Sequence, residues 1–167
     1  MPTVEHVQYM HRYHQWACGR VWRNLSDISV ADFIREIEGS TLRDITNHLI
    51  AATVGWTERL VHHRWPDGMP YPPDDLNPDA YVAYWKDREA ELDAFIDNLN
   101  PTSALVDVEY DNLPGRFFSH PTCEVLLQVF NHATYHRGQY MMQVRRLGLP
   151  TVQTDLIAML WERDSKD

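Results

Sequence analysis

The chain has 167 residues, of which 44% are hydrophobic and 23% charged, and a formal net charge of −9. The length predicts one domain, residues 1–167, and the composition is that of an ordinary globular protein. The acidic balance excludes nucleic acid as an expected partner, because phosphate binding requires a basic surface and the only basic cluster is the short Arg145-Arg146 pair.

Neither a membrane segment nor a secretion signal is expected. No stretch of 18 or more consecutive apolar residues occurs, and the N-terminus lacks a basic region followed by an apolar one. The two cysteines, Cys18 and Cys123, do not form a disulfide framework. We therefore expect a cytoplasmic protein with reduced thiols and no membrane partner.

The first half of the chain predicts three helices. Apolar periodicity indicates the first over residues 4–25. The second is expected over residues 41–65, where Thr41 followed by Asp44 has the pattern of a capping box. Five prolines make residues 66–78 a long loop that crosses the bundle, and Asn77-Pro78 then begins the third helix.

The second half predicts a hairpin and two more helices. Apolar residues alternate with acidic ones after residue 104 and a turn follows at 112–115, so we expect a short β-hairpin over residues 104–120. The fourth helix is expected over residues 122–147, and a short terminal helix over residues 155–163. The predicted fold class is therefore all-α.

Two histidines, His132 and His136, stand four residues apart within the fourth predicted helix. Side chains four apart share one face of a helix, with their Cβ atoms roughly 5–6 Å apart. Two imidazoles so placed can bind one divalent ion through nitrogens at roughly 2.0–2.1 Å. Such a pair also occurs among ordinary surface or core histidines, so a third ligand is needed to favour metal binding.

His48 is the candidate for that third ligand. It borders the inward stripe of the second predicted helix, three residues after Ile45 and four before Ala52. An imidazole that points partly inward requires a polar partner, because burying it unpaired is costly. The partner is either a backbone carbonyl or a metal ion shared with His132 and His136.

Four motifs are spread over nearly the whole chain. They are Tyr13-x-x-Trp16-Ala17, Leu42-Arg43-Asp44-x-x-Asn47-His48, Val129-x-Asn131-His132-x-x-x-His136-Arg137-Gly138-Gln139 and Asp155-Leu156-Ile157. Together they resemble the DinB/YfiT-like family of metal-dependent proteins. The resemblance implies a four-helix bundle in which His48, His132 and His136 bind one divalent metal ion. It also implies a homodimer.

One position departs from the family pattern. Relatives often have asparagine where this chain has Cys18. If that position faces the metal, the thiol would change the hydrogen bonds around the ion or bind it directly. His14 shares the inward stripe of the first helix with Ala17. The sequence leaves open whether Cys18 or His14 lies near the metal.

Three further residues flank the proposed ligands. The free ring nitrogens are expected to have hydrogen-bond partners, and Asp44, four residues before His48, and Gln128, four before His132, are candidates because each can share the face of its histidine. Arg137 should point roughly 100° away from His136, so we expect it to pair with a carboxylate on a neighbouring helix in preference to binding an anionic substrate.

Three histidine ligands leave at least one position open, which is the arrangement of catalytic zinc sites. That position can activate water or bind a thiolate. Relatives in the wider superfamily include transferases and isomerases that use low-molecular-weight thiols such as bacillithiol or mycothiol. We therefore expect a metal-dependent enzyme, either a hydrolase or a low-molecular-weight-thiol S-transferase, that acts on a small molecule. Its catalytic residues stay unassigned.

Zinc is the first choice of ion, and nickel, iron and manganese are alternatives, because all of them accept imidazole ligands. A rival interpretation is a non-catalytic protein. Its metal would only stabilise the bundle, or the bundle would bind a small ligand without transforming it.

Overall fold

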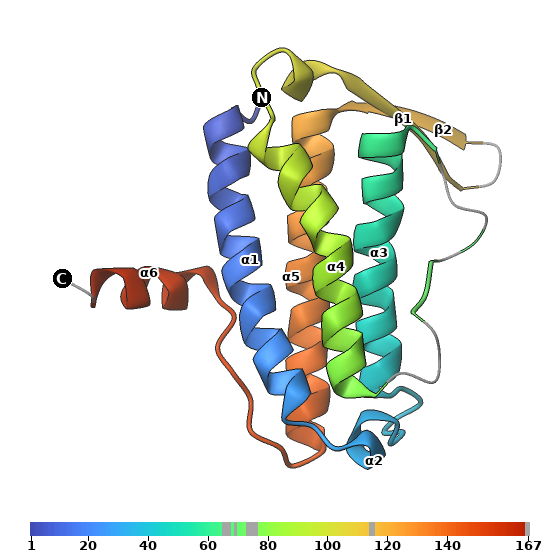
Figure 1. Cartoon of the computed structure of the whole chain (residues 1–167), viewed down its shortest axis with the longest axis vertical. Helices are drawn as coiled ribbons and strands as arrows, with labels where there is room; N and C mark the ends of the chain where they lie inside the picture. Colours follow the sequence, from blue (N-terminus) through green and yellow to red (C-terminus); the bar gives the residue numbers. More distant parts are fainter. Residues whose placement is uncertain (65–67, 69, 73–76, 114–115, 166–167) are drawn as a thin grey trace.

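The computed structural model describes the whole chain except residues 65–67, 69, 73–76, 114–115 and 166–167. Four long helices stand side by side (Figure 1), and they are α1 (Val4–Ser26), α3 (Leu42–His62), α4 (Pro78–Asp97) and α5 (Thr122–Arg146). This arrangement confirms the predicted four-helix bundle and the approximate bounds of its helices.

Local capping signals set the starts of α3 and α4. Thr41 Oγ1 accepts a hydrogen bond of 3.0 Å from the Asp44 N–H, and the Asp44 carboxylate accepts one of 2.9 Å from the Thr41 N–H. This reciprocal pair is the predicted capping box. Asn77 Oδ1 accepts from the Ala80 N–H at 2.9 Å, and Pro78 occupies the first helical position, where its missing N–H costs nothing.

The direction of the helices confirms the expected crossover. α3 and α4 run the same way, and α1 and α5 run the opposite way (Figure 1). Two neighbouring parallel helices require a connection that returns along the length of the bundle. Most of the loop predicted for residues 66–78 lies outside the described residues.

A hairpin covers the end of the bundle where α3 and α4 finish (Figure 1). It pairs β1 (Asp107–Leu113) with β2 (Arg116–Pro121) in antiparallel register, with Tyr110 opposite Phe118. A single 3₁₀ turn, η1 (Ser103–Leu105), leads into it. The alternation of apolar and acidic residues therefore predicted the hairpin correctly.

Two short helices of the described part of the chain lie outside the four. α2 (Val30–Phe33) was not predicted, because four residues are too few to show a helical period; the Phe33 ring packs edge-on against Tyr81 at 4.9 Å. α6 (Leu156–Asp164) follows the fourth helix as expected and projects away from the bundle (Figure 1). The Tyr13 hydroxyl helps to anchor this segment by donating to the Thr154 carbonyl at 2.8 Å.

Among the described residues, the core contains two hydrophobic clusters, and buried polar residues lie between their members along α1 and α4. On α1, Val7 belongs to one cluster and Cys18 to the other, and the buried His14 lies between them in sequence. On α4, Glu89 holds the equivalent place and is 2% exposed. Among the described residues, no helix is both long enough and apolar enough to cross a membrane.

Candidate metal centre

The three predicted histidines meet between α3 and α5. The Nε2 atoms of His48 and His132 are 3.1 Å apart, and the ring of His136 lies 4.3 Å from each of the other two, measured between centroids. One nitrogen from each ring falls within 4.8 Å of the others. Nitrogens bound to one tetrahedral zinc ion would stand about 3.3 Å apart, so the group has the size of a metal site.

Helix geometry explains why these rings lie at the edge of the helix interface. Each histidine directly precedes a buried residue of its own helix, and those residues are Leu49, Ala133 and Arg137. A side chain one residue earlier points about 100° away from the buried one. The histidines are therefore half-buried, facing the neighbouring helix while staying reachable from solvent.

A hydrogen bond orients His136. Its Nδ1 lies 2.6 Å from Gln139 Oε1. Because a carbonyl oxygen only accepts, Nδ1 carries the ring proton and the lone pair of Nε2 is free. Histidine ligands in metal sites commonly donate their second nitrogen in this way, which fixes both the tautomer and the ring orientation.

The surroundings of the three rings favour their neutral forms. Burial, together with the charges that His136 and His48 would carry, lowers the pKa of His132 to about 4. Burial and the neighbouring His48 also lower the pKa of His136, against the opposing effect of Gln139. Neutral imidazole is the form that binds a metal ion, so these two rings are ready to act as ligands at neutral pH.

Two of the expected hydrogen-bond partners were wrong. The carboxylate of Asp44 is engaged by the N–H and hydroxyl of Thr41 in the helix cap, and Gln128 lines a pocket nearer the hairpin. Gln139 makes the contact that sequence reasoning missed. It lies three residues after His136, a spacing that places both on one helix face and would have indicated the contact.

The predicted partner of Arg137, a carboxylate on a neighbouring helix, was also wrong. Arg137 is completely buried, and its guanidinium contacts Thr134 Oγ1 at 2.7 Å, His14 Nδ1 at 3.3 Å and Cys18 Sγ at 3.7 Å in place of the expected carboxylate. The carboxylate of Glu89 lies on the far side of the His14 ring, with Oε2 3.2 Å from Nε2.

Cys18 and His14 thus belong to a second cluster, distinct from the three histidines. Cys18 Sγ lies 3.6 Å from His14 Nε2, and the indole N–H of Trp85 donates to Glu89 at 2.8 Å. His14, Cys18 and Glu89 are all buried, and their ligand atoms lie within 4.8 Å of one another.

A pocket of about 330 Å³ lies between α3, α5 and the hairpin, on the hairpin side of the three histidines. Its wall combines aromatic and polar side chains, namely Trp56, Tyr110, His120, Glu124, Val125 and Gln128. Gln128 is four residues from His132, about 6 Å along the helix axis, so the pocket begins roughly one turn from the histidines.

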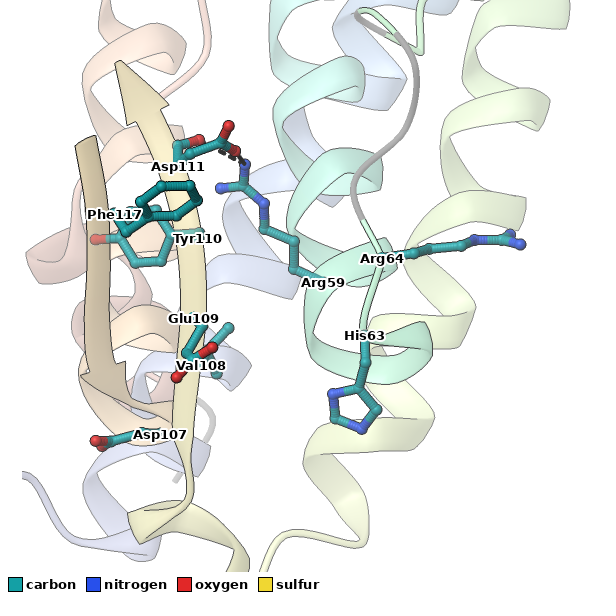
Figure 2. A pocket seen from close by; sticks show the side chains of 9 residues that line it. All are labelled: Arg59, His63, Arg64, Asp107, Val108, Glu109, Tyr110, Asp111 and Phe117. Atoms are coloured by element: carbon teal, nitrogen blue, oxygen red, sulfur yellow. Dashed lines mark hydrogen bonds and ion pairs between the residues drawn. The ribbon is translucent and has the colours of Figure 1, made fainter. Parts of the chain in front are cut away.

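A second pocket, of about 520 Å³, lies farther from the histidines, between the end of α3 and the hairpin (Figure 2). The Arg59 guanidinium points towards Asp111 and donates to its backbone carbonyl at 2.9 Å. Arg59 is eleven residues from His48, about 16 Å along the helix. No histidine of the candidate metal centre lines this pocket.

Fold and site together define a class: a four-helix bundle with three histidines converging between two of its helices. The chain belongs to the DinB family, whose family model matches residues 1–166. It is similar to a DinB-like protein from Bacillus cereus ATCC 10987, known from a crystal structure at 2.01 Å resolution. The TM-score is 0.65 at 16% identity, over 90% of this chain and 97% of the other, which shows a shared fold. No protein of curated function matches the chain.

Proposed function

We propose that this protein is a metal-dependent enzyme that binds one divalent ion through His48, His132 and His136. The observation that carries the proposal is the convergence of three imidazoles from two helices at ligand-like spacing. The lowered pKa of His132 and the Gln139 contact to His136 support it, since both favour rings that present a free nitrogen.

Partial exposure of the three rings favours an open site. A structural zinc site is closed by four protein ligands, whereas this group offers three that stay half-exposed. A divalent ion held there supplies Lewis-acid activation of a substrate or of water. His48, His132 and His136 would hold and orient it, since each ring is half-buried and reachable from solvent.

The neighbouring pocket provides room for the rest of a small substrate. Its volume of about 330 Å³ falls within the usual range for small-molecule sites, and Gln128 in its wall lies one helical turn from His132. Trp56 and Tyr110 offer an aromatic wall, with their rings edge-to-face at 5.1 Å, while Glu124 and Gln128 offer polar contacts. Hydrolysis and S-transfer from a low-molecular-weight thiol are the two reaction classes we propose, with zinc as the first choice of ion.

A non-catalytic role is the alternative, because ligands from α3 and α5 would also let an ion clamp the two helices together. The two roles differ in access to the metal. An open site exchanges a water molecule with bulk solvent, which water-proton relaxation measures on the Mn²⁺-loaded or Co²⁺-loaded protein. Slow or absent exchange, with a large fall in melting temperature on chelation, would favour the clamp.

Metal content is the first experiment. Protein purified without added metal and without a histidine tag is analysed by elemental mass spectrometry, beside the His132→Ala variant. We expect about one divalent ion per chain in the wild type and none in the variant. A wild-type protein that is metal-free and refuses added zinc, nickel, iron and manganese would overturn the proposal.

A further inference from the structure

The second cluster joins three helices through one continuous set of polar contacts. Trp85 and His14 both contact the carboxylate of Glu89, and the other nitrogen of His14 faces the guanidinium of Arg137. Arg137 in turn donates to Thr134 on its own helix. α1, α4 and α5 are thereby tied together within the core, where polar groups are costly unless they are paired.

His14, Cys18 and Glu89 have the donor atoms of a metal site, but Arg137 argues against one. A histidine that binds metal through Nε2 must donate from Nδ1, and a guanidinium only donates, so the 3.3 Å contact would set two donors face to face. Charge leads to the same conclusion. A divalent ion with a thiolate, a carboxylate and a neutral imidazole has no net charge, which would leave the buried Arg137 uncompensated.

Without a metal, two protonation patterns leave the cluster neutral when Glu89 is a carboxylate, the form that its lowered pKa favours beside His14 and Trp85. In one, Arg137 and Glu89 carry the charges, His14 is a neutral imidazole and Cys18 is a thiol. In the other, His14 is an imidazolium and Cys18 a thiolate. Burial lowers the pKa of His14, whereas its contacts with Cys18 and Glu89 raise it, to about 10 in all, so the choice between the two patterns rests on the geometry of the hydrogen bonds.

The Arg137 contact favours the first pattern. A neutral His14 can accept from Arg137 at Nδ1 and donate from Nε2 to Glu89, so both contacts become hydrogen bonds. An imidazolium would present a second donor to Arg137. The neutral ring is the one form that serves both partners.

We propose that Glu89, neutral His14 and Arg137 form a buried polar lock that sets the rotation of α5 and so points His132 and His136 at His48. The link to the histidines rests on their proposed role as metal ligands. Arg137 directly follows His136 and points about 100° away from it, so anchoring one side chain fixes the direction of the other. A helix rotation of about 15° would displace a side-chain tip by more than about 1 Å, beyond the tolerance of a binding site.

Nitrogen NMR of the metal-free protein tests the state of His14. We expect long-range proton–nitrogen correlations of a neutral ring protonated at Nε2, with the signals assigned by their loss in His14→Gln. Two protonated nitrogens, with a thiolate absorbance near 240 nm that Cys18→Ser removes and Cys123→Ser keeps, would overturn the neutral lock. Cys123 is the matched control because it is also buried and reduced.

Cadmium tests the rival metal site. The probe is Cd²⁺ added to the His132→Ala/His136→Ala double variant, in which the three-histidine group is dismantled. We expect no sulfur-to-cadmium absorption band. A band that appears at one ion per chain and is abolished by Cys18→Ser, but not by Cys123→Ser, would show that the cluster binds metal and would overturn the lock.

Glu89→Gln tests the positioning of the histidines, with Glu91→Gln as the control from the exposed side of the same helix. We expect Glu89→Gln to weaken the ring-to-ring nuclear Overhauser effects between His48 and His136 in the metal-free protein and to lower Co²⁺ affinity about 10-fold. Glu91→Gln should change neither. Unaltered ring contacts in folded Glu89→Gln would overturn the positioning role.

A second variant distinguishes lost positioning from failure to fold, and the wild-type Co²⁺ result distinguishes it from failure of the proposed function. If Glu89→Gln does not fold, Trp85→Phe keeps the Glu89 carboxylate, removes its indole donor together with part of the core packing, and should weaken the same ring contacts to a smaller extent. If the wild-type protein binds no Co²⁺, the proposed function fails, while the ring contacts and the state of His14 still decide whether the lock exists.

Discussion

His48 and His132 bring their Nε2 atoms within 3.1 Å of each other across 84 residues of sequence. Two nitrogens at this distance share a single proton as a hydrogen bond, or both direct lone pairs at a cation. They cannot both carry a proton without repulsion, which is one of the causes of the lowered pKa of His132. The pair is therefore sensitive to metal, to pH and to substitution of either ring.

Replacing His48 with alanine should lower zinc affinity at least about 100-fold, since the loss of a direct ligand should cost more than the 10–100-fold typical of a residue that only orients one. His120→Ala is the matched control, because His120 is also half-buried and hydrogen-bonds Tyr110 away from the three-histidine group. Competition with a fluorescent zinc chelator measures both affinities. Equal losses in the two variants would contradict the assignment of His48.

Gln139→Ala should lower zinc affinity by about 10–100-fold while the helical content is retained, because the His136 ring would lose the acceptor that fixes its tautomer. Gln128→Ala, in the pocket one turn beyond His132, should stay within about threefold of the wild type. The same competition assay compares them. A larger effect from Gln128 than from Gln139 would show that the groove, and not the Gln139 contact, controls binding.

The metal-free protein should lose stability as the pH falls from 6.5 to 4. The folded-state pKa of His132, about 4, is below the unfolded value of about 6.5, so the unfolded chain binds more protons in this window. This stabilising contribution is therefore present above pH 6.5 and is lost as the pH approaches 4.

Urea unfolding at pH 7 and pH 5 measures this effect. His132→Asn should show a smaller drop in midpoint than the wild type, and His6→Asn, an exposed position on α1, should show the same drop as the wild type. An unchanged pH dependence in His132→Asn would mean that His132 does not carry the lowered pKa.

Thr41→Ala should destabilise the protein by about 0.5–2 kcal/mol, because the capping box at the start of α3 would lose its side-chain acceptor and the Asp44 carboxylate one of its donors. Thr102→Ala, an exposed threonine outside the long helices, should change stability by less than about 0.5 kcal/mol. Thermal unfolding of both variants provides the comparison. Equal effects would argue that the cap does not stabilise α3.

Much of the fold could be predicted from the sequence because the relevant signals are local. Thr41 and Asp44 cap α3 over three residues, Asn77 and Pro78 begin α4, and helical periodicity indicates the long helices. α2 escaped prediction because it is too short to have a period.

The sequence by itself determined which histidines share a helix face and that three of them form a candidate site. Only the tertiary structure decided which side chains contact these histidines and the residues beside them. Asp44 was near enough to His48 in sequence to contact it, but the helix cap took its carboxylate, and Arg137 reached His14 on another helix. The physical reason is that spacing along one helix fixes a side chain's direction, whereas its partner depends on how the helices rotate against each other and on which acceptor or donor lies closest.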